Sequence, residues 1–379
     1  MKAILIGGGI GGLTAAIALR RAGIDAEVYE RSPVLKEVGA GISLWPNATK
    51  ALTLLGLGEE LLSISFRNKE FGIRKWNGAS ISTTPTAELE SRFGGGVLIV
   101  HRAELLEILA RSFGSEHFHL GHTLSSIEED AGGVTASFTN GETAHGDVLI
   151  GADGLSSQTR TWLGHQEKPR YSGYTAWRSI AEFESSGITP AETWGRGSRF
   201  GIFPMGKNRV YWYATANTPE GETGEESPQS TLLSYFKGWH SPIEDLIRAS
   251  GTAILRNDIF DRDPLPHWGR GRITLLGDAA HPMTPDLGQG ACQAIEDAME
   301  LANSLAAATT VTAGLQRYEA RRIARTKTIV LGSRRMGKIA QARSPMLCGL
   351  RDVAFKLTPR SVSLASLAPI IGFEGHLAG

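Results

Sequence analysis

The chain has 379 residues, of which 41 % are hydrophobic and 21 % charged, a composition typical of a globular protein with two or three domains. Its 39 Lys and Arg residues balance 39 Asp and Glu residues, so no bulk charge favours nucleic acid as a partner. No apolar run of about 18 residues predicts a transmembrane segment. The two cysteines, Cys292 and Cys348, suggest neither a disulfide framework nor a zinc cluster, and we expect a cytoplasmic protein, monomeric or homodimeric.

The amino-terminal residues predict a strand, a helix and a second strand. Residues 2–6 form a short apolar run that ends at glycine, residues 11–22 carry apolar side chains at helical spacing, and residues 26–30 are again typical of a strand. This βαβ order implies parallel strands joined by a right-handed crossover.

The turn between the first strand and the helix carries the pattern Gly7-x-Gly9-x-x-Gly12. Gly7 suits a tight turn, Gly9 lets the backbone approach a pyrophosphate, and Gly12 lets helix and strand pack closely. The N–H groups at the start of the helix attract phosphate. Glu30 ends the next strand, where its carboxylate suits a ribose 2′-OH and would repel a 2′-phosphate. The pattern therefore predicts bound FAD or NAD rather than NADP.

Two later strands also end in glycine. Residues 147–151 lead into Asp153-Gly154, and residues 272–277 lead into Asp278; a helix opens at Gly288-Gln289-Gly290. Because parallel sheets gather ligand groups at the carboxyl ends of their strands, both endings are candidate sites. Aspartate at such an end suits a ribose or ribityl hydroxyl, and the helix start would stabilise negative charge on a reduced flavin.

The intervening segments have a different pattern. Residues 71–84 and 171–216 alternate strand-forming residues around turns, as antiparallel hairpins do. We therefore expect an α/β fold in which a Rossmann-like dinucleotide-binding domain is interleaved with a mostly antiparallel substrate domain, followed by C-terminal helices. The predicted bounds are 1–70, 97–172 and 268–314 for the first domain, 71–96 and 173–267 for the second, and 315–379 for the C-terminal region, which starts with a basic helix.

The motifs Gly7-x-Gly9-x-x-Gly12, Asp153-Gly154 and Gly277-Asp278, in this order and spacing, resemble the class A single-component flavin-dependent aromatic hydroxylases. The most similar branches are urate hydroxylase, alkylquinolone hydroxylase and zeaxanthin epoxidase. The resemblance runs from Met1 to about residue 340 and implies that FAD lies extended across the first domain.

Carried over position by position, the resemblance assigns cofactor-binding residues beyond the glycines. Near the adenosine and phosphates it places Gly11, Glu30, Arg31 and Ser43. Beside the cofactor it places Arg102 and Leu124, of which Arg102 is independently suited to a pyrophosphate. At the ribityl and isoalloxazine end it places Asp278, Pro285, Leu287, Gly288, Gln289, Gly290 and Ala291. Asp153 is implied to serve both FAD and nicotinamide docking.

The resemblance also implies a reaction. In that family NADH or NADPH reduces FAD, O₂ adds to give a C4a-hydroperoxyflavin, and its distal oxygen hydroxylates an electron-rich aromatic or N-heteroaromatic ring. The protein would have to exclude water and hold the ring close to the flavin. Two alternatives stay open: an epoxidase acting on an alkene or isoprenoid, and a flavin-binding protein without oxygenase activity.

Three residues match the catalytic positions of the urate hydroxylase branch: Arg199, Tyr211 and Asp286. Together they could deprotonate and polarise a heteroaromatic N–H or a phenol. Ala176, Arg178 and Tyr213 are the predicted substrate contacts. Urate hydroxylases carry an asparagine where this chain has Ala176, and alkylquinolone hydroxylases tend to carry one where it has Asp286, so the substrate is left open. No metal site is predicted.

Overall fold

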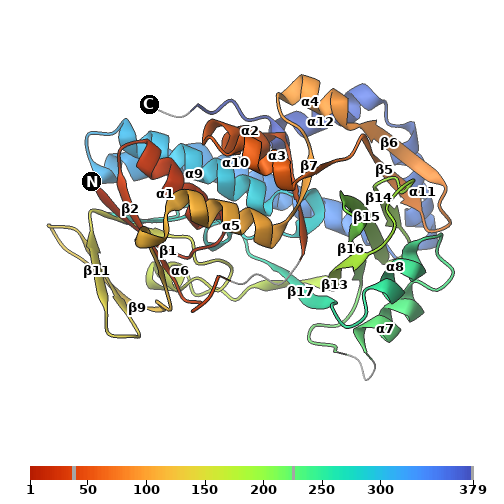
Figure 1. Cartoon of the computed structure of the whole chain (residues 1–379), viewed down its shortest axis with the longest axis horizontal. Coiled ribbons are helices and arrows are strands. Elements are labelled where there is room, and N and C mark those ends of the chain that lie inside the picture. Colours follow the sequence, from red (N-terminus) through yellow and green to blue (C-terminus); the bar gives the residue numbers. More distant parts are fainter. Residues whose placement is uncertain (36–39, 224–226, 377–379) are drawn as a thin grey trace.

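The structure, a computed structural model, describes residues 1–35, 40–223 and 227–376. Figure 1 shows two parts side by side: a helix-rich part around β1, β2, α1 and α9, and a part built around β13–β17 with α7 and α8. Among the described residues, no helix is both long and apolar enough to cross a bilayer.

A five-stranded parallel sheet organises the first part. Its order is β18-β12-β1-β2-β8, with β1 at Lys2–Ile6, β2 at Asp25–Glu30, β8 at Phe118–Leu120, β12 at Val148–Gly151 and β18 at Ile273–Leu275. Ile6 pairs with Gly151, and Gly151 pairs with Leu275. This register brings the carboxyl ends of β1, β12 and β18 to one edge of the sheet.

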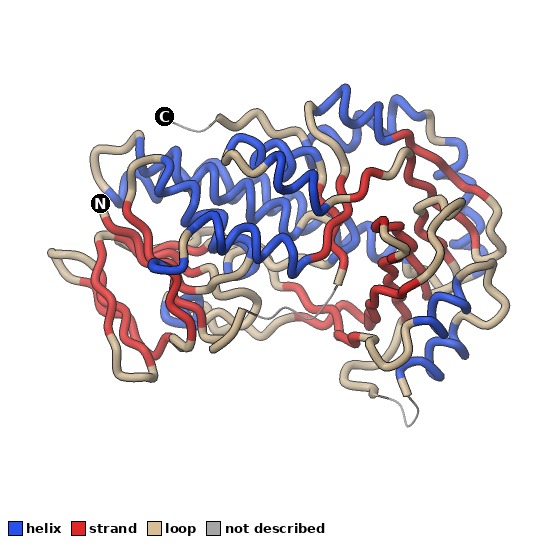
Figure 2. The backbone as a smooth tube through the Cα atoms, in the orientation of Figure 1, coloured by secondary structure: helices blue, strands red, loops and turns tan. Residues whose placement is uncertain are grey.

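Helices cover one face of this sheet and a small antiparallel sheet covers the other. The helices are α1 (Ile10–Arg21), α2 (Pro46–Leu54), α3 (Gly58–Ile64), α5 (Arg102–Phe113), α9 (Gly290–Ala306) and α10 (Val311–Ala340), and α1 packs against both α5 and α9. The small sheet holds β9 (Leu124–Glu129), β10 (Val134–Phe138) and β11 (Thr143–Gly146), and a short helix, α6, spans Gln158–Trp162. Figure 2 shows this layering of helices over strands.

The second part is a seven-stranded sheet of order β17-β13-β16-β15-β14-β5-β6. Its strands are β5 (Glu70–Lys75), β6 (Ser80–Pro85), β13 (Arg170–Glu182), β14 (Ala191–Trp194), β15 (Ser198–Gly206), β16 (Arg209–Ala216) and β17 (Leu255–Asp261). Its pairings are antiparallel except that of β14 with β5. Side chains such as Trp177, Phe200 and Trp212 pack on one face against α7 (Pro228–Tyr235) and α8 (Ile243–Ala249).

A three-stranded sheet and the C-terminal helices complete the molecule. The sheet has order β3-β7-β4, with β3 at Gly41–Leu44, β4 at Phe66–Arg67 and β7 at Leu98–His101. The remaining helices are α4 (Thr86–Phe93), α11 (Pro345–Leu357) and α12 (Arg360–Ile371), and short 3₁₀ turns occupy Ser115–His117, Gly277–Ala279 and Pro285–Leu287.

The predicted fold class is confirmed, since a Rossmann-like parallel sheet and a mostly antiparallel sheet are interleaved along one chain. The expected elements lie within a few residues of the observed ones; the basic helix predicted to start at 315 begins at Val311. We propose the predicted segment bounds as the domain bounds, because the strands of the two large sheets fall into those segments, apart from the first residue of β5 and the first three of β13. Residues 36–39, 224–226 and 377–379, which these segments include, lie outside the described residues.

A buried charge cluster ties α9 to α10. Arg322 donates through Nε to Asp297 at 2.6 Å and through Nη1 to Glu296 at 2.6 Å, and all three side chains are at least 96 % buried. Arg325 adds a second cation on Glu296 at 2.7 Å. Burial alone would raise the pKa of Asp297, but His281 and Arg322 outweigh it and lower that pKa to about 2. The cluster therefore depends on every member being present.

We predict that Arg322→Met lowers the free energy of unfolding by about 3–5 kcal/mol, because two buried carboxylates lose their shared cation. Arg321→Met is the matched control, since Arg321 is 56 % exposed and contacts only Glu300 among the described residues. The control should cost less than about 1 kcal/mol. Urea unfolding of both variants measures the difference, and equal losses would contradict a structural role for the cluster.

Candidate active site

The glycine turn after β1 has the geometry that its sequence predicted. Gly7 adopts φ +108°, which favours glycine, and a Cβ on Gly12 would lie 2.0 Å from the Gly7 carbonyl oxygen. A Cβ on Gly9, by contrast, would meet nothing within 4 Å. Gly7 and Gly12 are therefore required by the protein itself, whereas Gly9 leaves open space at the start of α1.

The start of α1 can receive a negatively charged group. Gly9 is its N-cap residue and supplies no side-chain hydrogen bond to the first-turn N–H groups. Glu30, at the end of β2, lies beside this turn, because its Oε2 accepts from the Gly8 N–H at 2.7 Å and its Oε1 from the Ser32 N–H at 2.9 Å. Each carboxylate oxygen keeps a further lone pair for a hydroxyl donor.

The start of α9 offers a second such place. Its N-cap, Gln289, likewise makes no side-chain capping bond. A Cβ on Gly290 would lie 3.9 Å from Oδ1 of Asp278. Although Asp278 is an exposed residue, the surrounding protein atoms partly displace water from its carboxyl, and this desolvation raises its pKa. The positive charges of His281 and Arg102 oppose that rise. Arg102, at the start of α5, lies close enough to Asp278 for its charge to act on that carboxyl.

Buried groups hold the loop that carries Asp278. Asp297 accepts from the Gly277 N–H at 3.0 Å and contacts the His281 ring at 2.5 Å. From the other side, Arg160 donates to the carbonyls of Ala279 and Ala280 at 3.1 and 3.3 Å. Burial first, and then the neighbouring Arg262, lower the pKa of Arg160 to about 10. The segment after Asp153 is thus joined directly to the segment after β18.

The side chains of three predicted cofactor residues form hydrogen bonds or pack within the protein itself. Asp153 accepts hydrogen bonds from Ser157, Gln158 and Thr159, so its carboxylate is used at the first turn of α6, whose N-cap is Ser157. Gln289 is buried against Asn47, and Leu124, the first residue of β9, packs in the core between the small sheet and the parallel sheet. For these three residues a cofactor contact through the side chain stays a prediction, since each side chain also makes contacts within the protein.

The other predicted cofactor residues lie around the same sheet edge and the adjoining β3. Gly11 packs against Ala294 and Leu276, and Arg31 is exposed after β2. Ser43, on β3, accepts through its carbonyl from Cys292 of α9, which brings β3 to the start of that helix. The 3₁₀ turn before α9 contains Pro285 and Leu287, Gly288 follows with φ +61°, and Ala291 is in the first turn of α9.

The predicted substrate residues share one face of the seven-stranded sheet. Arg199 pairs with Thr215 across β15 and β16, and Thr215 pairs with Ala176 on β13. In the next rows, Tyr213 is opposite Arg178 and Tyr211 is opposite Ile180. Because side chains alternate along a strand, this face is the one turned away from α7 and α8.

Asp286 reaches this face through two contacts. Arg199 donates through Nη2 to its Oδ1 at 2.6 Å, and the Tyr174 hydroxyl donates to its Oδ2 at 2.8 Å. The Asp286 side chain is fully buried, and Arg199 is 3 % exposed. Burial, followed by the charge of Asp286, raises the pKa of Tyr174 well above its ordinary value, so this phenol stays protonated and donating.

Glu192, on β14, accepts from the other terminal nitrogen of the Arg199 guanidinium. Its Oε1 accepts from Nη1 at 2.9 Å, while Nε of Arg199 faces Thr215 and Gln341 at 3.3 Å. Burial opposes the charge of Arg199, but Glu192 and Asp286 outweigh it and raise the arginine pKa. Arg199 is thus a fixed cation between two carboxylates.

Tyr211 lies at the other end of this face, against the first domain. Its ring packs on Gly41 of β3, where a Cβ would come within 2.3 Å of it. Burial raises the pKa of Tyr211, and nearby Arg178 and Arg102 counteract that rise. Phe203 stacks with Tyr211 and Tyr213 at ring-centre distances of 6.0 and 5.9 Å. The predicted trio is only partly brought together: the described contacts join Arg199 to Asp286, and Tyr174 rather than Tyr211 completes the group.

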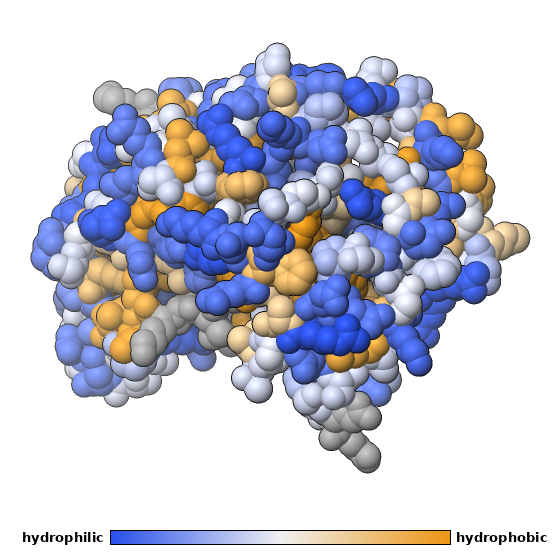
Figure 3. All heavy atoms as spheres, turned by 45° about the vertical axis from the view of Figure 1, so that its right-hand side comes forward, coloured by the Kyte–Doolittle hydropathy of each residue, from blue (hydrophilic) through white to orange (hydrophobic). Residues whose placement is uncertain are grey.

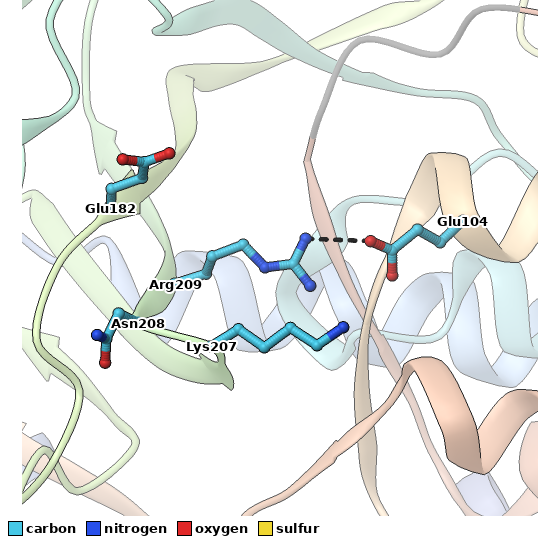
Figure 4. A pocket seen from close by; sticks show the side chains of 5 residues that line it. All are labelled: Glu104, Glu182, Lys207, Asn208 and Arg209. Atoms are coloured by element: carbon cyan, nitrogen blue, oxygen red, sulfur yellow. Dashed lines mark hydrogen bonds and ion pairs between the residues drawn. The ribbon is translucent and has the colours of Figure 1, made fainter.

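Two hollows lie near these residues. One, of about 400 Å³, is lined by Tyr174 and Asp286 together with four cations from β13, α10 and its end: Arg170, Arg334, Lys338 and Arg343. The other, of about 460 Å³, lies between α5 and the β15–β16 hairpin, where Figure 4 shows Arg209 reaching across to Glu104. That ion pair spans 3.0 Å, and no predicted site residue lines this second hollow.

Sequence reasoning missed Tyr174 and Glu192. The signal for Tyr174 was present, because it precedes Ala176 and Arg178 by even steps and therefore shares their face of β13. Glu192 had no such signal, since only the pairing of β14 with β15 brings it to Arg199.

Comparisons with known proteins agree with this geometry. A family model described as an FAD-binding domain matches residues 1–333. The aurachin C monooxygenase/isomerase of Stigmatella aurantiaca is 40 % identical over 94 % of both chains, and an FAD-dependent urate hydroxylase of Klebsiella pneumoniae is 37 % identical over 92 % of both. The structure of Klebsiella pneumoniae HpxO with FAD and uric acid superposes with a TM-score of 0.92 at 35 % identity, covering 98 % of this chain and 96 % of that one.

The chain belongs to this FAD-binding family. The resemblance to class A flavin-dependent aromatic hydroxylases is confirmed, and the chain is a flavin-dependent monooxygenase. Its residues fit FAD: the open space over Gly9 and the uncapped start of α1 suit the pyrophosphate, Glu30 suits a ribose, and Asp278 with the start of α9 suits the ribityl and ring end.

We predict that Gly9→Ala and Gly12→Ala separate cofactor binding from folding of this flavoprotein. In Gly9→Ala the new methyl group enters the open space, so FAD affinity should fall by about tenfold or more while the apoprotein loses less than about 1 kcal/mol. In Gly12→Ala the methyl group meets the Gly7 carbonyl, so the apoprotein itself should be destabilised by about 1–3 kcal/mol. FAD titration by fluorescence and urea unfolding of the apoproteins check both; unchanged FAD affinity in Gly9→Ala would contradict the assignment.

Proposed function

We propose that this monooxygenase hydroxylates a planar, electron-rich N-heteroaromatic or aromatic ring bound on the face of the seven-stranded sheet that carries Arg199, Tyr211 and Tyr213. The observation that carries the proposal is the buried contact of Asp286 with Arg199 and Tyr174. It fixes a carboxylate two residues before Gly288, next to the helix start that suits the flavin ring. Base and cofactor site are therefore contiguous.

In this proposal Asp286 accepts a proton from a ring N–H or phenolic O–H, which makes the ring more nucleophilic. Arg199 and Tyr174 hold the carboxylate in one orientation, and each of its oxygens keeps a lone pair for the substrate. The hollow lined by Tyr174 and Asp286 gives the accepted proton a way to solvent on the α10 side. Arg199 acts here as a positioning residue for Asp286.

Flavin, when bound and reduced, supplies the activated oxygen. The protein's own part is to exclude water and to orient the ring. Phe203, Tyr211 and Tyr213 provide an aromatic wall for stacking, and Ile99 and Met205 close it with apolar side chains. Arg178, half-buried beside Tyr211, is the polar contact available at that end.

Ala176 narrows the substrate class. It is 1 % exposed, lies between Tyr174 and Ile259, and offers no hydrogen bond where urate hydroxylases are expected to have an amide. We therefore favour a ring whose edge at this position is apolar, such as a quinolone, over a purine trione. NADH or NADPH and O₂ are the proposed co-substrates, and we propose a cytoplasmic monomer or homodimer.

The test is a panel of phenols, purines and quinolones offered to the purified holoenzyme with NADH or NADPH and isotopically labelled O₂. We expect one class to accelerate NAD(P)H oxidation and to gain one labelled oxygen atom on a ring carbon by mass spectrometry. An epoxide product, or oxidation that no member accelerates, would contradict the proposal.

We predict that Asp286→Asn, which keeps the shape of the side chain, lowers kcat for the accepted substrate by about a hundredfold or more, because the proton acceptor is lost. Arg199→Met should lower it similarly by releasing Asp286. Arg209→Met is the control, since it removes an arginine of the adjacent strand whose partner is Glu104. FAD content and urea unfolding are measured in parallel, and full turnover in Asp286→Asn would remove Asp286 from the reaction.

A further inference from the structure

The helix α11 turns an apolar face toward solvent. Met346 is 77 % exposed, Leu350 66 %, Val353 52 % and Leu357 74 %. These residues recur at helical spacing and so form one stripe along the 13-residue helix. Surface helices ordinarily place such a stripe against the core. Figure 1 places α11 at the right-hand side of the molecule, and Figure 3, turned so that this side comes forward, shows apolar surface along its right edge.

The orientation of α11 is fixed by its opposite side. Cys348 is buried, Arg351 donates to the Ala340 carbonyl at 2.9 Å and lies 4.8 Å from the ring centre of Trp194, and Phe355 packs on the same ring at 4.9 Å. The apolar stripe therefore faces outward because the other face is already occupied.

The surroundings of the stripe are cationic. From Arg335 to Arg360, all described, the single acidic residue is Asp352, which is half-buried and contacts Arg351 at 2.9 Å and Lys75 at 3.7 Å. The same stretch contains the cations Arg335, Lys338, Arg343, Arg351, Lys356 and Arg360. Of these, Lys356 lies on α11 and is exposed, and the exposed residues Arg343 and Arg360 lie three positions before and after the stripe, whereas Arg351 is buried on the opposite side and Lys338 lines the hollow beside Asp286. Arg360 pairs with Glu88 of α4 at 3.0 Å.

An exposed aromatic residue follows directly on a residue that contacts α11. Lys75 of β5 contacts Asp352 of this helix, and the next residue, Trp76, is 52 % exposed. Tryptophan combines a large apolar ring with an N–H donor and is enriched where proteins meet the interface of a bilayer.

We propose that α11 docks this enzyme onto the surface of an anionic phospholipid bilayer. The helix would lie in the plane of the interface, with Met346, Leu350 and Leu357 among the acyl chains and the cations at the headgroups. With 13 residues it is too short to span a bilayer. This inference does not depend on the proposed substrate.

A second copy of the chain fits the stripe less well. In a two-fold dimer the same patch meets itself, so each cationic rim would face its own copy. Lys356 and Arg343, both exposed, would then approach like charges, because the nearby carboxylates Asp352 and Glu88 already pair with Arg351 and Arg360. An anionic lipid surface satisfies both the apolar stripe and the rim.

The test is co-sedimentation of the FAD-loaded holoenzyme with vesicles of phosphatidylcholine, with and without phosphatidylglycerol. We expect binding to the anionic vesicles that weakens at high salt. The double variant Leu350→Glu/Leu357→Glu should reduce it by about tenfold or more, because two apolar side chains that would enter the bilayer are replaced by charged ones. Leu62→Glu, on α3 and 46 % exposed before substitution, is the matched control and should bind as the parent does.

Lys356→Glu reverses one charge and leaves the apolar stripe intact. It should therefore weaken binding to anionic vesicles and leave any binding to pure phosphatidylcholine unchanged. FAD content and NAD(P)H oxidation of all variants in vesicle-free buffer should match the parent, because α11 carries no residue of the active site. Absence of binding, or equal loss in Leu62→Glu, would overturn the proposal. So would sedimentation velocity showing a dimer that Leu350→Glu/Leu357→Glu dissolves, since the stripe would then be a subunit interface.

Discussion

The loop after β18 and its position against α10 depend on the contacts of one buried carboxylate, that of Asp297. It accepts from the Gly277 N–H, contacts the His281 ring and pairs with Arg322, so one side chain connects the loop after β18 to α10. Losing one partner would leave charge uncompensated in the interior. The position of Asp278, which follows Gly277 directly, is thereby set by charge pairing as well as by the turn itself.

A second buried ion pair joins the two domains at the site. Arg199 belongs to the seven-stranded sheet, whereas Asp286 belongs to the turn that leads into α9, and their contact is fully enclosed. Tyr174 and Glu192 complete the hydrogen bonding around them. Because neither charge can be left unpaired at low cost, the contact fixes the seven-stranded sheet relative to the turn that leads into α9.

The parts of the site that depend on neighbouring residues in the sequence were predictable. The glycine turn, Glu30 and the helix starts are local features, because their backbone geometry depends on a few consecutive residues. Arg199 and Asp286 were found only through resemblance, and their direct contact spans 87 positions. The hydrogen bonds of Asp153 to the first turn of α6 were not anticipated, since nothing in the spacing distinguishes a carboxylate that binds backbone N–H groups from one that faces a ligand.

The sequence by itself determined the strand–turn–helix geometry at Gly7 to Gly12 and the class of cofactor, because φ preferences and hydrophobic periodicity act over short separations. Only the tertiary structure decided which carboxylates bind arginines, which tyrosine completes the Asp286 group, and which side of α11 faces outward. Those outcomes depend on strand register and on which surface is already covered, and both arise from contacts between residues far apart in the chain.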